Sequence, residues 1–201
     1  MGRADVRSHG FYAMPTRTFL ALDMDALILD RLAEAQRRLD DGQSKVNWVA
    51  RENLHVTMNF LGDVPDEILH EVCNLAAAAA SEIEPFEFHV QGVACVPPAG
   101  QPRMFWAMID DPTGRMLRLR RALDAALDGL GLRQEDRSFK PHVTLARIKF
   151  SRNPRGLRAG ASDLADQEFG VQHAEELVAY ASRLGSGGPT YLPLARAKLG
   201  G

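Results

Sequence analysis

Apolar and polar residues alternate along this chain in patterns that predict both strands and helices. Strands are expected where apolar side chains recur at every second residue or stand in short runs, and helices where they recur at intervals of three and four. The expected strands are 17–22, 46–49, 54–61, 86–96, 104–109, 142–150, 176–184 and 191–199. The expected helices are 25–39, the stretch after Pro65 with its apolar stripe at Ile68, Val72 and Ala79, and 113–130.

Segments without such a pattern are expected to be turns and loops. Residues 62–65 are expected to form a turn, Gly131 to end the third helix, and the basic stretch after Phe150 to form a loop. The glycine-rich residues 185–188 are expected to close a final hairpin. The order of elements therefore predicts an α+β fold, in which antiparallel sheets carry helices on their outer faces in two similar lobes.

One short pattern stands in two of the expected strands. His55 and Thr57 are separated by one apolar residue, and so are His142 and Thr144. Residues two apart on a strand point to the same face, so each pair offers an imidazole and a hydroxyl side by side. If the two strands face each other, one cleft holds two imidazoles and two hydroxyls.

The spacing around this pattern indicates an internal duplication. The histidines are 142 − 55 = 87 residues apart, and Phe19 and Phe105 in the preceding apolar runs are 105 − 19 = 86 apart. Two features repeated at nearly the same offset predict pseudo-twofold symmetry.

Length and composition agree with a single globular domain. The chain has 201 residues, of which 45% are hydrophobic. Residues 1–15 show no periodicity and are expected to form a flexible extension, which leaves 16–201 as the domain. No run approaches the roughly 18 apolar residues of a membrane span. Cys73 and Cys95 are expected to be reduced thiols in a cytoplasmic protein, because they form no Cys-x-x-Cys pair.

The distribution of charge along the chain is more informative about possible ligands than the net charge. A net charge of −2 does not indicate a nucleic-acid-binding protein, but the stretch from Arg137 to Arg158 contains seven Lys and Arg residues and no Asp or Glu. This basic block surrounds the second His-x-Thr pattern. It is either a solvated surface or a surface that meets an anionic ligand, and both interpretations stay open.

Two histidines across a cleft suit displacement at phosphorus. Imidazoles titrate near neutral pH, so a neutral one can accept a proton from water while a protonated one donates to a departing oxygen. The threonine hydroxyls can donate to phosphate oxygens, and Arg147 can add bidentate contacts. This chemistry requires no metal and no cofactor. A metal site built on the histidines would need further Asp, Glu, His or Cys ligands, which neither pattern contains.

The full motifs resemble those of the 2H phosphoesterase superfamily, and within it the bacterial and archaeal RNA 2′,3′-cyclic phosphodiesterases, also called 2′-5′ RNA ligases. The resemblance covers residue 16 to the C-terminus. It rests on Phe-Leu-Ala-Leu-Asp at 19–23, Asn-Leu-His-Val-Thr-Met at 53–58, Phe-Leu-Gly at 60–62, Phe-Lys-Pro-His-Val-Thr-Leu-Ala-Arg at 139–147 and Ser-Arg-Leu-Gly at 182–185.

The resemblance implies a bilobal, pseudo-symmetric α+β fold with the active-site cleft between the lobes. It also implies hydrolysis of a 2′,3′-cyclic phosphate at an RNA end to a 2′-phosphomonoester. By position, His55 matches the family's proton donor and His142 its proton acceptor. Thr57 and Thr144 match the residues that hold the phosphate, and Arg147 matches a phosphate contact. The reverse reaction would join RNA ends through a 2′-5′ linkage. The nearly symmetric chemistry by itself does not decide which histidine is the acid.

Four further residues are candidates for contacts with the rest of a substrate. Trp48 stands at the edge of the expected cleft and could stack a base, and Lys140 is a further substrate-binding candidate. Arg51 and Arg103 could contact an RNA backbone or belong to the solvated surface, and both interpretations stay open. The expected partners are RNA ends, tRNA fragments among them, or cyclic nucleotides, and the protein is expected to be a monomer without membrane contact.

Two other functions remain open on the sequence. The same chemistry could act on a small cyclic nucleotide or an ADP-ribose cyclic phosphate. The chain could also be a non-catalytic RNA-binding module, although the two complete His-x-Thr patterns argue against that alternative.

Overall fold

The computed structural model describes residues 14–132, 139–185 and 188–201. Of the expected N-terminal extension, all but Met14 and Pro15 lie outside the described residues, as do Arg137 of the basic block and residues 186–187 of the final turn.

The structure confirms the α+β class. Its strands are β1 (Thr16–Leu22), β2 (Lys45–Trp48), β3 (Val56–Val64), β4 (Phe86–Val96), β5 (Met104–Asp110), β6 (His142–Phe150), β7 (Glu168–Ala174), β8 (Glu176–Gly185) and β9 (Gly188–Lys198). Its helices are α1 (Ala26–Leu39), α2 (Asp66–Ser81), α3 (Arg115–Leu127) and α4 (Pro154–Ser162), with a 3-10 turn, η1 (Arg51–Asn53).

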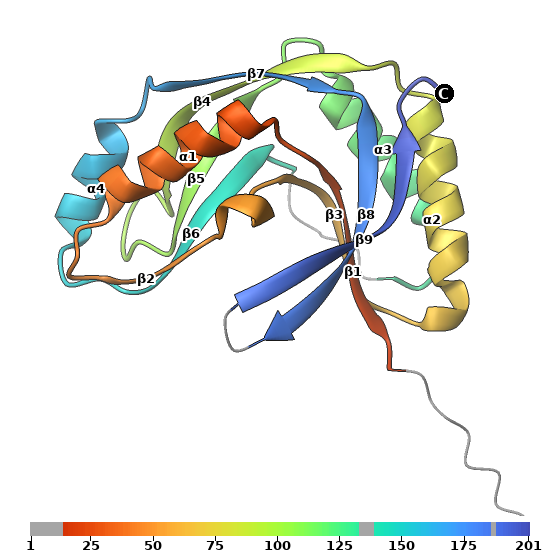
Figure 1. Cartoon of the computed structure of the whole chain (residues 1–201), viewed down its shortest axis with the longest axis horizontal. Coiled ribbons are helices and arrows are strands. Elements are labelled where there is room, and N and C mark those ends of the chain that lie inside the picture. Colours follow the sequence, from red (N-terminus) through yellow and green to blue (C-terminus); the bar gives the residue numbers. More distant parts are fainter. Residues whose placement is uncertain (1–13, 133–138, 186–187) are drawn as a thin grey trace, which may run out of the picture.

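The strands form one curved antiparallel sheet in which the two lobes meet. Its order is β7-β4-β5-β6-β3-β1-β8-β9, and β2 pairs with residues 146–150 of β6. The lobes are therefore two halves of a continuous sheet (Figure 1), joined between β3 and β6 at the paired residues Val56 and Val143. Both of these valines are fully buried, so the junction lies in the core.

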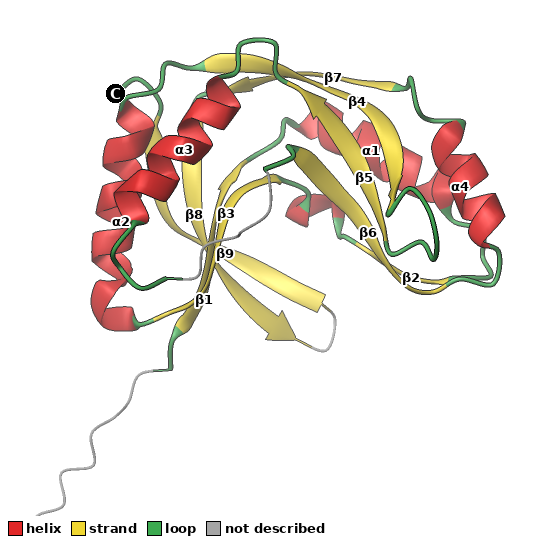
Figure 2. Cartoon of the chain, turned by 180° about the vertical axis from the view of Figure 1, so that it is seen from behind, coloured by secondary structure: helices red, strands yellow, loops and turns green. Residues whose placement is uncertain are grey.

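Helices α2 and α3 lie together against one lobe, and α1 and α4 lie together against the other (Figure 2). Helix α1 follows β1 along the chain but packs against β6, β7 and α4 of the other lobe. Helix α3 follows β5 and likewise packs against β3 and α2 of the opposite lobe. This reciprocal exchange is what a duplicated pair of strand–helix units with a twofold relation produces, and it ties the lobes together.

One loop expected from the sequence is a helix. The prediction of a basic loop after Phe150 is wrong, because α4 occupies Pro154–Ser162. Asn153 caps this helix by accepting a hydrogen bond from the Gly156 amide at 2.9 Å, and Pro154 takes the first turn, where its missing N–H costs nothing. The cap and the buried Leu157 and Ala161 outweigh the two glycines of the helix.

Other boundaries differ from the expectation by a few residues. Strand β3 continues to Val64 rather than turning at 62–65, because Gly62 adopts a φ of +74° inside a strand that pairs with β1. Strand β7 is not among the expected strands. Helix α3 ends at Leu127, so Gly131 does not cap it.

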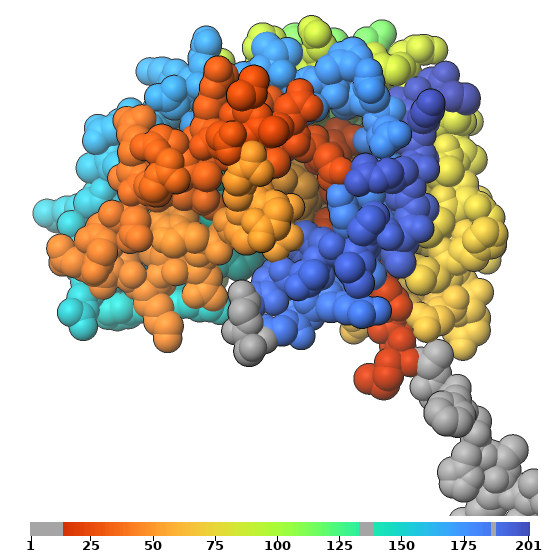
Figure 3. Space-filling model, viewed as in Figure 1, coloured from red at the N-terminus to blue at the C-terminus, as the bar shows by residue number. Residues whose placement is uncertain are grey.

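Strands β8 and β9 form the expected hairpin, which lies beside the segment that leads into β3. In the space-filling view the hairpin, in blue, stands against the orange segment of β2 and η1 (Figure 3). The hydrogen bond from the Asn53 side chain to the Pro189 carbonyl, at 2.8 Å, joins the two. Among the described residues, no helix is both long and apolar enough to cross a membrane.

Buried Gln36 of α1 provides a test of how the lobe around β6 is held. Its side-chain amide donates to the Val49 carbonyl at 2.8 Å and to the Leu145 carbonyl at 2.9 Å. We expect Gln36→Ala to lower the free energy of unfolding by about 2–4 kcal/mol, because it removes two buried hydrogen bonds and leaves a cavity. The measurement is urea denaturation.

The exposed Gln43 is the matched control, and Gln43→Ala should change the free energy of unfolding by less than about 0.5 kcal/mol. Equal effects of the two substitutions would contradict a structural role of Gln36.

Candidate active site

The first His-x-Thr unit is ordered by its own backbone. His55 precedes β3, and its Nδ1 lies 2.8 Å from the Asn53 carbonyl oxygen, an atom that can only accept. Nδ1 therefore carries the proton and donates it. The other ring nitrogen, Nε2, lies 2.9 Å from the Thr57 hydroxyl. In the neutral imidazole, Nε2 is an acceptor.

The second unit is built in the same way. His142 begins β6, and its Nδ1 lies 2.7 Å from the carbonyl oxygen of Lys140, again two residues earlier. Thr144 follows on the same face of the strand. The same carbonyl contact therefore sets the same imidazole tautomer in both copies.

An aromatic ring lies flat against each imidazole. Phe19 of β1 stacks on His55 with ring centroids 4.8 Å apart, and Trp106 of β5 stacks on His142 at 3.8 Å. Trp106 follows Phe19 by 87 residues, the same offset that separates the histidines. The spatial counterpart of Phe19 is thus Trp106, and not Phe105 as the sequence suggested.

Both motif strands bulge one residue after the threonine. In β3, Leu20 and Ala21 pair with Asn59 and Thr57, which leaves Met58 as the extra residue. In β6, Phe105 and Trp106 pair with Ala146 and Thr144, which leaves Leu145 as the extra residue.

Each bulge reverses the alternation of side chains along its strand. The residue three positions after the threonine therefore shares its face. That residue is Phe60 in β3 and Arg147 in β6, and both line the same cavity as the threonines. A regular strand would turn Arg147 away from Thr144.

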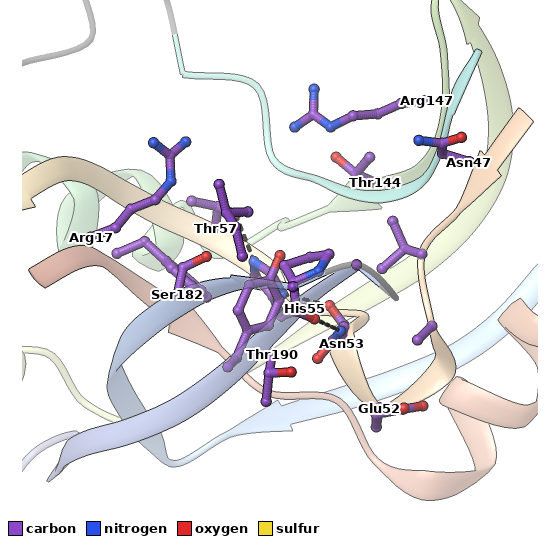
Figure 4. Close-up of a pocket in the computed structure, with 18 of the residues that line it drawn as sticks. Arg17, Asn47, Glu52, Asn53, His55, Thr57, Thr144, Arg147, Ser182 and Thr190 are labelled. Atoms are coloured by element: carbon purple, nitrogen blue, oxygen red, sulfur yellow. Dashed lines mark hydrogen bonds between the residues drawn. The ribbon is translucent and has the colours of Figure 1, made fainter. Parts of the chain in front are cut away.

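The two lobes enclose a cavity of about 790 Å³. Its lining includes Asn47, Trp48, Thr144 and Arg147 from one lobe and Arg17, His55, Thr57, Ser182 and Tyr191 from the other. In the close-up, Arg17 and Arg147 lie on opposite sides of Thr57, and Glu52 lies at the far end (Figure 4).

Burial and neighbouring charges oppose each other at His55. Burial is the largest effect and lowers the pKa of the imidazole below its ordinary value of 6.5, and the nearby His142 lowers it further. The carbonyl of Asn53 and the carboxylate of Asp23 raise it in part. In the free protein His55 is therefore held toward its neutral form.

Asp23 is oriented by two donors behind the site. The Tyr180 hydroxyl donates to Asp23 Oδ1 at 2.7 Å, and Arg196 donates to Oδ2 at 3.2 Å. Burial and the carboxylate raise the pKa of Tyr180, so it remains a donor at neutral pH. Asp23 thus stays in place as a negative charge that acts on His55.

Tyr191 of β9 closes the cavity from the hairpin side. Its ring meets His55 edge-on at 5.4 Å and Phe19 at 4.8 Å. Burial raises the pKa of its hydroxyl, while Arg147 and Arg17 both act to lower it. The hydroxyl therefore lies within the field of both guanidinium groups.

The other candidate residues are placed differently from one another. Trp48 lines the cavity and stacks on Phe105 at 6.0 Å. Arg51 pairs with Asp30 at 2.6 Å and donates to the Ala26 carbonyl, and it does not line the cavity. Lys140 is exposed and contributes its backbone carbonyl to His142. The engagement of Arg51 outside the cavity argues against its predicted contact with substrate.

The sequence pattern did not identify Arg17, Tyr191 and Asp23 as parts of the site. Asp23 ends the motif at 19–23, but nothing in the sequence pattern assigned it a role. Tyr191 stands on the hairpin of β8 and β9, which joins the strand of Arg17 through pairing of β1 with β8, for example Thr18 with Ala181, 181 − 18 = 163 residues apart. No group of three or more His, Cys, Asp or Glu side chains that could hold a metal occurs in the described part of the chain.

The low pKa of His55 can be measured directly. We expect the imidazole of the free protein to titrate below 6.5, followed by NMR of the ring carbon–proton signals, with His55→Asn assigning the resonance. The unfolded chain then binds this proton more readily than the native one, so His55 makes stability fall as the pH drops below 6.5. Titration at or above 6.5 would contradict the dominance of burial.

Comparison with known proteins places the chain in a family. The family described as LigT like Phosphoesterase matches residues 22–106 and 109–191. A relative from Methanothermobacter thermautotrophicus is 32% identical over 178 residues, which cover 89% of this chain and 96% of the relative. One from Archaeoglobus fulgidus is 32% identical over 180 residues, covering 89% and 97%. Both are named RNA 2′,3′-cyclic phosphodiesterase.

Solved structures agree on the fold. A crystal structure of a Thermus thermophilus protein matches with a TM-score of 0.79 at 29% identity, over 92% of this chain and 98% of that one. Escherichia coli LigT in its apo form matches with a TM-score of 0.72 at 24% identity, over 93% and 99%. These matches confirm the resemblance seen in the motifs: the chain belongs to the family of LigT-like phosphoesterases, within the 2H phosphoesterases, and is an enzyme.

Proposed function

We propose that this enzyme hydrolyses the 2′,3′-cyclic phosphate at RNA ends to a 2′-phosphomonoester without a metal ion. The observation that carries the proposal is the pair of His-x-Thr units on two adjoining strands, each with its imidazole held by the same backbone contact. His55 and both threonines line one cavity, and His142 is near enough to His55 to lower its pKa. The name shared by relatives that align with about nine-tenths of the chain supports the choice of substrate.

The reaction is an in-line displacement at phosphorus. The neutral imidazole of His142 accepts a proton from water as the water oxygen bonds to phosphorus. The bond between phosphorus and the ribose 3′ oxygen breaks, and protonated His55 donates its Nε2 proton to that oxygen. Atoms balance, because one water is consumed and the 2′ ester remains.

The assignment of acid and base follows the family resemblance. His55 is held toward its neutral form in the free protein, so it must take up a proton before it can act as the acid. A bound phosphate anion beside Nε2 favours the charged imidazole and raises its pKa. Asp23, behind the ring, acts in the same direction.

Thr57, Thr144 and Arg147 stabilise the charge that gathers on the phosphate. The hydroxyl of Thr57 lies beside Nε2 of His55, and Arg147 reaches the cavity because of the bulge at Leu145. Preorganised donors of this kind act most strongly where the cavity excludes bulk water. Trp48, on the cavity wall, is placed to stack a terminal base.

The same site can also join two RNA ends. If the 5′-hydroxyl of a second RNA end takes the place of water, its oxygen bonds to phosphorus of the cyclic phosphate, the 3′ oxygen leaves, and a 2′-5′ linkage forms; cleavage of that linkage is the reverse step. We further propose that the enzyme is a monomer and works in the cytoplasm; the two free cysteines agree with a reducing compartment.

The first test uses an RNA oligomer that ends in a 2′,3′-cyclic phosphate, incubated with the protein in EDTA. We expect a 2′-phosphate product. His55→Ala and His142→Ala should each lower the rate by about 10²–10⁴-fold, because each removes a proton-transfer group. Thr57→Val and Thr144→Val should cost less, roughly ten- to a hundredfold.

Three outcomes would contradict the proposal. Activity that EDTA abolishes and a divalent ion restores would overturn metal independence. A 3′-phosphate product would reverse the orientation of the substrate. Binding without turnover of RNA ends, nucleoside cyclic phosphates or an ADP-ribose cyclic phosphate would point to a non-catalytic protein.

The second test compares two arginines. We expect Arg147→Gln to lower kcat/KM roughly ten- to a hundredfold, because a charge-assisted hydrogen bond to phosphate is lost. Arg51→Gln should change kcat/KM by less than about threefold, since its guanidinium is engaged by Asp30 outside the cavity. A larger loss for Arg51→Gln than for Arg147→Gln would mean that the site is misassigned.

A further inference from the structure

Each lobe places one arginine against one apolar side chain at the cavity. In one lobe, Arg147 of β6 pairs in register with Met104 of β5, and its Nη1 lies 3.8 Å from the Met104 sulfur. In the other, the guanidinium of Arg17 on β1 lies over the ring of Phe60 on β3, 4.6 Å from the ring centroid.

These four residues are counterparts under the duplication. Met104 follows Arg17 by 87 residues, and Arg147 follows Phe60 by 87, the same offset that separates the two histidines. The arginine and its apolar partner have therefore exchanged strands between the two copies. In the first copy, the residue three positions after the threonine is the apolar Phe60. The arginine there is Arg17, which comes from the neighbouring strand β1.

Both guanidinium groups face the same space. Arg17 and Arg147 line the cavity, and they approach it from opposite sides of Thr57 (Figure 4). Both arginines also act to lower the pKa of the Tyr191 hydroxyl, which lines the same cavity.

Arg17 has no anionic partner in the described part of the chain. Its cross-strand neighbour Asp63 forms no ion pair with it, and no other described carboxylate does. Its side chain is exposed, and its guanidinium rests against the ring of Phe60. An unpaired cation that is held against a ring is oriented without being neutralised.

We infer that Arg17 binds a second phosphate of the substrate, the backbone phosphodiester that precedes the terminal nucleotide of an RNA end. The cyclic phosphate carries one negative charge, for which Thr57, Thr144 and Arg147 already provide donors. A guanidinium on the opposite side then matches the next charge along the backbone, since RNA carries one per nucleotide.

This inference rests on the proposed function and narrows it. A mononucleotide 2′,3′-cyclic phosphate has one phosphate and leaves Arg17 without a ligand. A dinucleotide or longer RNA end supplies a ligand for both arginines. The preferred substrate class is therefore an oligonucleotide end, and the choice between RNA and small cyclic nucleotides depends on this residue.

The experiment measures kcat/KM on three substrates: adenosine 2′,3′-cyclic phosphate, the dinucleotide ApA with the same cyclic end, and that dinucleotide with a neutral methylphosphonate linkage. We expect the wild-type enzyme to prefer the charged dinucleotide over its neutral analogue by roughly tenfold or more. In Arg17→Met, which keeps an apolar contact with Phe60, this ratio should fall to about one. Turnover of the mononucleotide should stay within about threefold of wild type.

Arg103→Met is the matched control, because Arg103 is exposed, stands next to Met104 and does not line the cavity. It should leave the charged-to-neutral ratio unchanged. An unchanged ratio in Arg17→Met would overturn the inference, and so would equal losses on all three substrates, which would assign Arg17 to the reacting phosphate. If the wild-type enzyme turned over none of the three, the proposed function itself would fail.

Discussion

The site depends on one constraint, the side-by-side placement of β3 and β6 at the junction of the two lobes. The fully buried pair Val56 and Val143 joins these strands. Each valine directly follows one of the two histidines, so pairing the strands here also brings the two imidazoles near each other. A buried apolar contact thus helps to set the distance between two polar groups.

Exchange of α1 and α3 between the lobes stabilises that junction. Each helix buries its apolar stripe against the half of the sheet that its preceding strand does not belong to. Separation of the lobes would expose both stripes together, at a cost that scales with the apolar area uncovered. Gln36 adds a polar link, since its amide binds the carbonyl of Leu145 at the bulge itself.

Two arginines of the basic block, Arg158 and Arg147, have different roles in the structure. Arg158 donates to the carbonyls of Pro97, Pro98 and Gly100, which holds the loop before β5. Arg147, eleven residues earlier, enters the cavity. The acidic total charge of the protein is therefore compatible with a cationic site, because two guanidinium groups are concentrated at one concave place and Glu52 lies at its far end.

The class of fold, the family and the central groups of the candidate site could all be predicted from the amino-acid sequence, and the structure and the relatives confirm the fold class and the family. His55, Thr57, His142 and Thr144 could be found because their chemistry is written in a local, period-two pattern that occurs twice. The offset of 87 residues between the two histidines also indicated the internal duplication. The helix at 154–162 was not predicted, because its two glycines disfavour a helix. A side-chain cap and burial against distant strands stabilise it nevertheless.

The other side chains at the cavity could not be predicted from the sequence, because the packing of distant segments brings them there. Arg147 reaches it through a bulge, and a bulge is a property of strand pairing that a single strand does not reveal. Arg17 and Tyr191 stand on strands whose neighbours are set by the sheet order, while Asp23 follows β1 and acts on His55 through its charge. Arg51, also a candidate in the sequence, pairs with Asp30 instead. The physical reason is range: backbone alternation is local, whereas register, bulges and ion pairs depend on which segments far apart in the chain pack together.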